Sequence, residues 1–225
     1  MNPPPSASLR LWQLISPALP IGAFAYSQGL EYAVEEDWVN NEESAAQWII
    51  GLINHSLCSL DVPILARFYQ AWQSNDLQKV LYWNRYLQAS RESNELLTED
   101  RQIGGTLKQL LNDLQIIQVY KWPEAEQPSF ATMFTLAACH WQVPVTETCH
   151  GFLWSWSENQ VAAAIKLVPL GQTAGQRILS RIIDEIPLAV ERGLKVTDNE
   201  IGMAAHGLGI ASALHEKQYT RLFRS

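Results

Sequence analysis

The sequence has few charged residues and few cysteines, and both shortages limit what the protein can be. Only 17% of the 225 residues are charged, the formal net charge is −7, and Lys and Arg are scattered along the chain. Such a distribution does not build the positive surface that attracts phosphate backbones, so we expect no nucleic-acid partner. Three cysteines (Cys58, Cys139 and Cys149) are too few and too oddly numbered for a disulfide framework, which favours a reducing cytoplasm.

Long apolar runs are also missing. No stretch of about eighteen uninterrupted apolar residues is present to span a bilayer, so we expect no membrane contact. The first residues, MNPPP, have no basic region followed by an apolar stretch, so no signal peptide is expected. The chain is nevertheless 47% hydrophobic and has nine Trp, which indicates a large core and some apolar surface shared with other proteins.

Apolar residues recur with a helical period along almost the whole chain, and strand-like alternation is nearly absent. We therefore predict an all-α fold, a single helical domain of about ten helices over residues 1–225. Residues 1–8 are expected to be a Pro-rich flexible leader, and residues 216–225 a C-terminal tail. Residues 121–129, with two prolines, are the expected surface loop.

Several helix limits follow from local signals. Asn40 or Asn41 is the expected cap of a helix that runs toward residue 57. The apolar segments 145–156 and 162–168 read as two separate stripes. The last helix is expected to begin at Thr197 or Asp198 and to end near Leu214.

Cys and His pairs suggest metal ligation but have the wrong spacing. Cys139-His140 and Cys149-His150 are adjacent pairs, and His55 and Cys58 lie one turn apart. Neighbouring helical residues point about 100° apart, so one ion seldom binds both. Cys149 also falls on an apolar stripe, where a free thiol packs as a small hydrophobe. We predict no metal site, and keep a transient metal role for these residues as the weaker hypothesis.

No motif for nucleotide binding or catalysis is complete. Residues 169–176, PLGQTAGQ, place three residues between the glycines, whereas a P-loop has four followed by Lys and Ser or Thr. No nucleophile elbow, HExxH or GxGxxG motif is present. His215-Glu216 is an acid–base pair in principle, but a solvated helix end is the favoured interpretation. We expect no catalytic residues and no cofactor.

Four blocks of sequence stand out. They are LISPALPIGAFAYSQGLE at 14–31, Arg91-Glu92 with RQIG at 101–104 and then Leu107, KLVPLGQTAGQ at 166–176, and the tail from His215 to Ser225. Together they resemble the UreF family of urease accessory proteins, follow the order of its blocks and span nearly the whole chain. Lys166 and Thr220 stand where Arg and Ser are more usual in the family, and Lys lacks the bidentate fork of Arg.

The resemblance implies an all-α, dimeric protein without chemistry of its own. Its implied partners are UreD (also called UreH), the GTPase UreG and apo-urease. Together they insert nickel into apo-urease, and the family member regulates or couples GTP hydrolysis by the GTPase. A direct nickel carrier with Cys and His ligands is the alternative, and a helical enzyme with its own substrate is a distant third.

Candidate partner-binding residues lie in the first, second and last blocks. The turn at 20–27 is expected to be a rigid amphipathic knob or a packed helix connection, and the central block an interface anchor or a surface ion network. Gly171 and Gly175, with Gln172 and Gln176, are assigned to close packing near a dimer contact. The candidates for partner binding are Phe24, Tyr26, Ser27, Glu31, Arg91, Glu92, Arg101, Arg221, Leu222, Phe223 and Arg224.

The last five residues, RLFRS, are predicted to be a docking peptide that is not part of the core. Chain ends are poorly ordered unless they are tied down, yet Leu222 and Phe223 stand between two arginines. The expectation is that Phe223 enters a pocket of the partner while the arginines meet carboxylates. The alternative is that Leu222 and Phe223 fold back on their own core.

Overall fold

The protein is described by a computed structural model over residues 3–202 and 205–225, and this part of the chain is all-α. It contains ten α-helices and no strand, which confirms the predicted fold class. Three short 3₁₀ turns cover Ala23–Ala25, Ile117–Lys121 and Asp198–Glu200. The helices are α1 (Ala7–Ile15), α2 (Leu30–Glu35), α3 (Glu42–Leu52), α4 (Asp61–Gln73), α5 (Leu77–Ala89), α6 (Asn94–Asp113), α7 (Phe130–His140), α8 (Val145–Leu167), α9 (Gln172–Leu194) and α10 (His206–His215).

Polar side chains cap the helices at the positions where the apolar stripes begin. Asn41 accepts from the backbone N–H of Ser44, and the Ser44 hydroxyl bonds back to the cap, which completes a capping box for α3. Asp76, Ser93 and Ser129 cap α5, α6 and α7 in the simpler way, each accepting one N–H of the first turn. Local sequence thus determines where these helices start.

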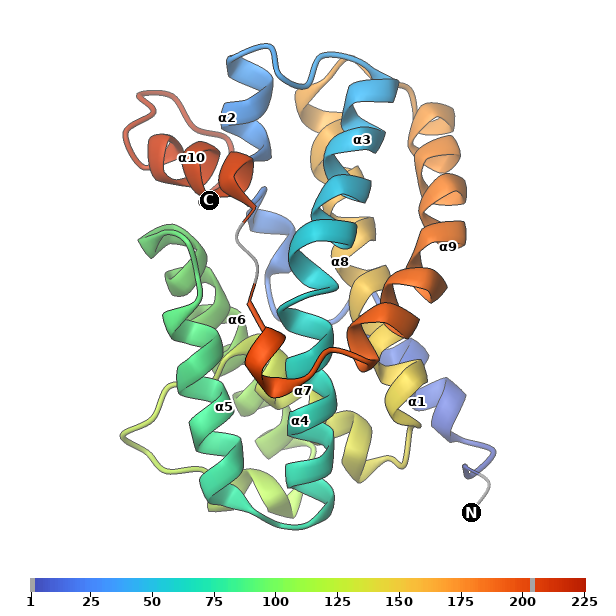
Figure 1. The fold of residues 1–225 in the computed structure, drawn as a ribbon, viewed down its shortest axis with the longest axis vertical. Coiled ribbons are helices and arrows are strands. Elements are labelled where there is room, and N and C mark those ends of the chain that lie inside the picture. The colour runs from blue at the N-terminus through green and yellow to red at the C-terminus, as the bar shows by residue number, and fades with distance from the viewer. Residues whose placement is uncertain (1–2, 203–204) are drawn as a thin grey trace.

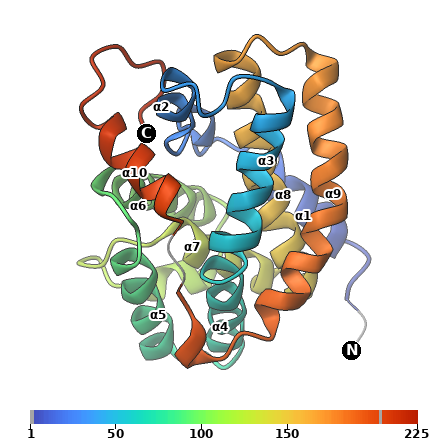
Figure 2. The ribbon, with the colours of Figure 1, turned by 45° about the horizontal axis from the view of Figure 1, so that its top comes forward.

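The helices form a layered bundle (Figure 1). α8 packs against α9 and α1, α6 packs against α7, and α4 lies against both α5 and α7. The short helices α2 and α10 pair with each other, and the C-terminal residues lie next to them in both views (Figure 2). Segments from the two ends of the sequence therefore meet at one corner of the molecule.

The hydrophobic core runs through most of the bundle. Phe130, Phe134 and Phe152 pack with ring centroids 5.4–5.5 Å apart and join α7 to α8. α7 is buried from Ala131 to Ala138, as its all-round apolar sequence predicts. No single described helix is long and apolar enough to cross a membrane. One bent pair, Glu42–Leu57 with Asp61–Gln73, meets that criterion by length and composition.

Three predicted boundaries are wrong. The leader ends before residue 8, because α1 begins at Ala7 and the side chain of Ala7 is buried. Met1 and Asn2 of the expected leader lie outside the described residues. α8 is one continuous helix, since the polar residues between its two apolar stripes lie on the same helix rather than in a break. Thr197 caps only a 3₁₀ turn through Glu200, so the last helix begins at His206.

Candidate partner-binding site

The C-terminal tail, residues 219–225, lies on the body of the protein (Figures 1 and 2). Phe223 is 6% exposed and Ser225 is 1% exposed, whereas Leu222 is 66% exposed and Tyr219 is fully exposed. The prediction that the tail is separate from the core is therefore wrong for Phe223, whose ring is buried. Of the two apolar residues in the tail, Leu222 is the one that faces outward.

Glu31 on α2 binds the tail backbone directly. One carboxylate oxygen accepts from the N–H of Leu222 at 2.6 Å, and the other accepts from the N–H of Phe223 at 2.9 Å. Glu31 is only 7% exposed, so both bonds lie away from water and are charge-assisted. Glu31 therefore holds the tail from inside the molecule, and its carboxylate is not free for a partner.

The residues just before α2 extend this attachment. The backbone N–H and the hydroxyl of Ser27 both donate to the carbonyl of Ser225, at 2.8 and 2.5 Å. The N–H of Arg224 donates to the carbonyl of Ala25 at 2.9 Å. The Ser225 hydroxyl donates to Glu99 on α6 at 2.6 Å. Ser27 is fully buried, so like Glu31 it binds the tail rather than presenting a surface.

His215, at the end of α10, completes the attachment. Its side chain is fully buried, with Nδ1 2.7 Å from a Glu95 oxygen and Nε2 3.1 Å from a Glu31 oxygen. The second Glu95 oxygen accepts from Arg221 at 2.6 Å. The interpretation of His215 as part of a solvated helix end is therefore wrong, because α10 packs against α2 and covers the ring. We call Glu31, Glu95, His215 and Arg221 the tail clamp.

Gly29 allows α2 and α10 to approach this closely. It has φ +77°, and a Cβ atom there would lie 3.0 Å from the backbone N of Ser212 and 3.1 Å from the Cβ of Ala211. A larger residue would be strained in this conformation and would push α10 away. The glycine inside the first sequence block thus serves the packing of α2 on α10.

The predicted knob at residues 20–27 is divided between surface and core. Phe24 is 68% exposed, but Tyr26 is 5% exposed and its hydroxyl donates to Gln102 at 2.8 Å. Tyr26 is therefore part of the packed connection, which was the alternative interpretation of this turn. Phe24 is the residue of the pair that a partner can reach.

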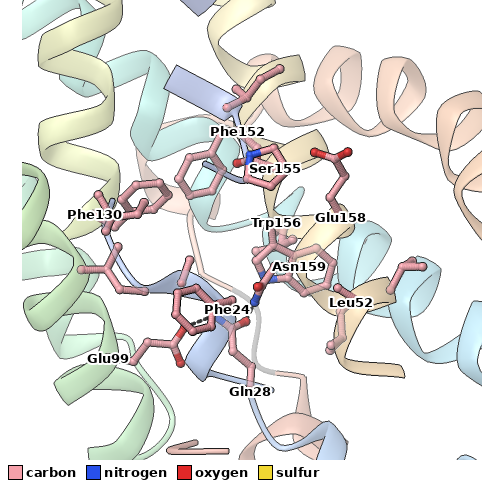
Figure 3. A pocket seen from close by; sticks show the side chains of 18 of the residues that line it. Phe24, Gln28, Leu52, Glu99, Phe130, Phe152, Ser155, Trp156, Glu158 and Asn159 are labelled. Carbon is pink, nitrogen blue, oxygen red and sulfur yellow. Dashed lines mark hydrogen bonds between the residues drawn. The ribbon is translucent and has the colours of Figure 1, made fainter. Parts of the chain in front are cut away.

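A cavity of about 390 Å³ lies behind this turn, between residues 14–28 and helices α3, α6 and α8 (Figure 3). Phe24, Phe152 and Trp156 contribute apolar walls. Gln28 crosses one side, donating to Glu99 and accepting from the Trp156 indole N–H, both at 2.7 Å. The cavity is therefore mainly apolar, with polar groups on the α6 side and also on α8, where Glu158 and Asn159 line it.

A buried ion network forms one end of the cavity. Arg91 binds Asp61 at 2.9 Å and Asp100 at 3.2 Å, and Asp100 also accepts from the N–H of Phe130 at 2.9 Å. Burial raises the pKa of Asp61 although Arg91 opposes the shift. Burial alone would lower the pKa of Arg91, but the two aspartates together raise it. Arg91 is therefore an internal link between α4 and α6, which corrects its expected role as an interface anchor.

The other two residues of the central block lie in different surroundings. Glu92 lines the cavity, and burial raises the pKa of its carboxyl. Arg101 is exposed, and its Nε donates to Gln88 at 3.0 Å. Only Arg101 of the three presents its charged group at the surface.

The two glycines of the third block have different roles. A Cβ atom on Gly175 would lie 2.4 Å from the Cδ1 of Ile165, so α9 approaches α8 closely there. Gly171 has open space around it, so it packs closely against no described part of its own chain, and its assignment to a dimer contact stays a prediction. Gln172 and Gln176 are exposed on the first turns of α9.

The cysteines behave as packed side chains. Cys149 is fully buried, and burial raises the pKa of its thiol to about 12. Cys58 is buried and its thiol contacts the carbonyl of Ala189 at 3.3 Å, while Cys139 is half-buried. Within residues 3–202 and 205–225, no three or more His, Cys, Asp or Glu side chains are arranged to hold a metal ion.

Sequence reasoning missed two acidic residues of α6 that face the tail. Glu95 and Glu99 are one helical turn apart, which puts both on one face of the helix. Burial raises the pKa of Glu99 to about 7, against the hydrogen bonds from Ser225 and Gln28 that favour its charged form. The i, i+4 spacing of two carboxylates was the available signal, but it did not reveal that the face is buried.

Comparison with known proteins gives one consistent result. The UreF family model matches residues 39–183. The chain is 48% identical to the urease accessory protein UreF of Alkalilimnicola ehrlichii over 222 residues, which cover 99% of this chain and 97% of the relative. It is 48% identical to that of Marinobacter nauticus, covering 97% and 94%, and 45% identical to that of Hahella chejuensis, covering 99% and 100%.

Proposed function

Because the chain belongs to the UreF family of urease accessory proteins, we propose that it is a non-catalytic assembly factor for urease. In this proposal it joins UreD (UreH) and the GTPase UreG, and the complex inserts nickel into apo-urease. The protein contributes binding surfaces and regulates or couples GTP hydrolysis by the GTPase. Membership of the family supports a role in urease maturation, and the exposed side chains of the tail region support a role in binding a partner.

The observation that carries the binding role is the outward face of the tail and α10. The tail backbone is bound from inside, while Leu222 and Tyr219 are 66% and 104% exposed. On α10, Ile210 and Leu214 are 52% and 39% exposed. Arg224 adds an exposed positive charge to the same segment. Aromatic and aliphatic side chains beside Arg are typical of interface centres, so we assign this face to UreD (UreH).

A pair of variants tests this assignment. Leu222→Ala with Tyr219→Ala removes exposed contact area, so co-purification with UreD should fall at least about tenfold while the melting temperature stays unchanged. Ile117→Ala is the matched control, since Ile117 is 70% exposed on another part of the surface. Wild-type binding by the tail variant would refute the assignment.

Reconstitution tests the proposed process as a whole. Apo-urease is incubated with nickel, GTP, UreD and UreG, with and without this protein. Urease activity should depend on the protein, and the tail variant should lose that dependence while Ile117→Ala retains it. Equilibrium dialysis of the isolated protein with nickel separates the direct-carrier alternative, for which tight stoichiometric binding is the expected result.

Two further features belong to the proposal. We place the protein in the cytoplasm and treat it as a homodimer. Exposed Ile183 and Leu188 on α9, each 52% exposed, and the exposed glutamines of its first turns supply a face for a second copy. Exposed Phe24 and Arg101 remain as candidate contacts for the other partners. Sedimentation of the wild type and of Ile183→Asp tests the dimer.

A further inference from the structure

We propose that His215 is a positioning residue that carries both ring protons, and that this imidazolium sets how the tail is presented to its partner. The inference rests on the proposed partner-binding function and names the residue that fixes the tail for it. It makes tail attachment depend on one buried ring.

The hydrogen bonds of the His215 ring indicate that both of its nitrogens carry a proton. Nδ1 lies 2.7 Å from a Glu95 oxygen and Nε2 lies 3.1 Å from a Glu31 oxygen. An ionised carboxylate only accepts, and a neutral imidazole has only one N–H to donate. A neutral ring would therefore turn a nitrogen lone pair toward one of the two carboxylates. The doubly protonated ring satisfies both contacts.

The charges of the tail clamp balance when the His215 ring is an imidazolium. The tail clamp contains two carboxylates, Glu31 and Glu95, and two cationic groups, Arg221 and the His215 imidazolium. His215 is fully buried, and the side chains of Glu31 and Glu95 are 9% and 12% exposed. Loss of one cation would leave a carboxylate in a poorly solvated place without its partner, which is strongly unfavourable.

The clamp is linked to the tail backbone through the carboxylate of Glu31. The Glu31 oxygen that contacts His215 also accepts from the N–H of Phe223, and the other oxygen accepts from Leu222. A side chain at position 215 that lacks the two N–H donors and the charge of the imidazolium does not hold this carboxylate in place. The tail is therefore bound tightly through this ring and loosens when the ring is replaced.

Other titratable groups lie close to the clamp, and their effects have to be distinguished from that of His215. Glu99 lies one turn further on α6 and binds Ser225, and burial raises its pKa to about 7. Glu216 follows His215 and accepts from the backbone N–H of Glu95 at 3.2 Å. Glu99→Gln removes titration of Glu99 while keeping an amide that can donate to or accept from Ser225.

The experiment measures the exchange protection of the amide hydrogens of Leu222 and Phe223 in the full-length protein. At about pH 6, after correction for the intrinsic exchange rate, protection should be at least about tenfold lower in His215→Gln than in the wild type. Glu99→Gln and His55→Gln, the latter at an exposed position, should keep the protection of the wild type. Nitrogen-15 spectra of the wild type should show two protonated ring nitrogens at the same pH.

Two results would overturn the inference. One is protection of Leu222 and Phe223 in His215→Gln equal to that in the wild type. The other is a ring spectrum of a single neutral tautomer in the wild type at about pH 6. Failure of the proposed function has a different signature. If His215→Gln releases the tail and still binds UreD with wild-type affinity, the clamp inference holds and the assignment of the tail to UreD is wrong.

Discussion

Replacing Arg91 with Ala should strongly destabilise the protein, because the change leaves two buried aspartates without their cation. Asp61 and Asp100 are 1% and 7% exposed, and the Arg91 side chain is 15% exposed. Breaking a buried ion pair by removing one partner costs about 3–5 kcal/mol. We take about 3 kcal/mol, because Arg91 is partly exposed and water can enter the vacated space. For a chain of this length, that corresponds to a fall in melting temperature of about 6–12 °C.

Urea denaturation followed by tryptophan fluorescence measures the effect. Arg101→Ala is the matched control, since Arg101 is exposed and its Nε bonds to Gln88, and it should cost less than about 1 kcal/mol. Adding Asp61→Asn to the Arg91 variant should recover part of the loss, because it removes one of the uncompensated charges.

The dependence of this loss on pH supplies a second check. Burial already raises the pKa of Asp61, and without Arg91 its carboxyl binds a proton at still higher pH. A raised pKa in the folded state stabilises at low pH and loses that contribution as pH rises. The Arg91→Ala variant should therefore be closer to the wild type at about pH 5 than at about pH 8. A loss below about 1 kcal/mol at neutral pH, or an equal loss in Arg101→Ala, would refute the buried-network account.

Three further changes test other parts of the structure. Glu99→Gln should flatten the dependence of the unfolding free energy on pH. Because the folded-state pKa of Glu99 is about 7, wild-type stability should fall by about 1–3 kcal/mol as pH rises from about 4.5 to 7. A variant with the same pH dependence as the wild type in urea denaturation would contradict this. Gly104→Ala should cost about 1–3 kcal/mol because its Cβ would lie 2.2 Å from the backbone carbonyl oxygen of Pro128, whereas Gly105→Ala, at the next position of α6 with open space around it, should not destabilise; equal effects in calorimetry would count against the packing account. Cys149→Ala should leave urease reconstitution intact, because burial raises the pKa of the thiol to about 12 and keeps it protonated; a folded variant that fails at nickel delivery would show otherwise.

Local sequence signals predicted the presence of the helices well, but they predicted where each helix begins and ends less well. Asn41 was one of two expected caps and is the observed one, because its side chain reaches the backbone of Ser44. Thr197 also has a complete capping box, yet only a 3₁₀ turn follows it. A cap favours a helix start, but the length of the helix depends on what its next turns can pack against.

The candidate site was only partly predictable. The sequence blocks selected segments that lie close together, since the turn at 20–27, the central block and the tail all meet at or near the cavity and the tail clamp. The direction in which each side chain points was not predictable. Tyr26 and Phe223 were expected at interfaces and are buried, and the Arg91 side chain is only 15% exposed, whereas Leu222 is exposed.

Periodicity, helix caps and sequence blocks by themselves determined the all-α fold, most helix starts and the family resemblance, because these depend on residues a few positions apart. Tertiary structure alone decided which polar groups are internal. Glu31 and His215 are 184 residues apart in sequence and meet only because α2 packs on α10. Each is an ordinary surface-type residue in its own helix. Burial between two helices from opposite ends of the chain makes them partners, and a pattern of neighbouring residues does not contain that information.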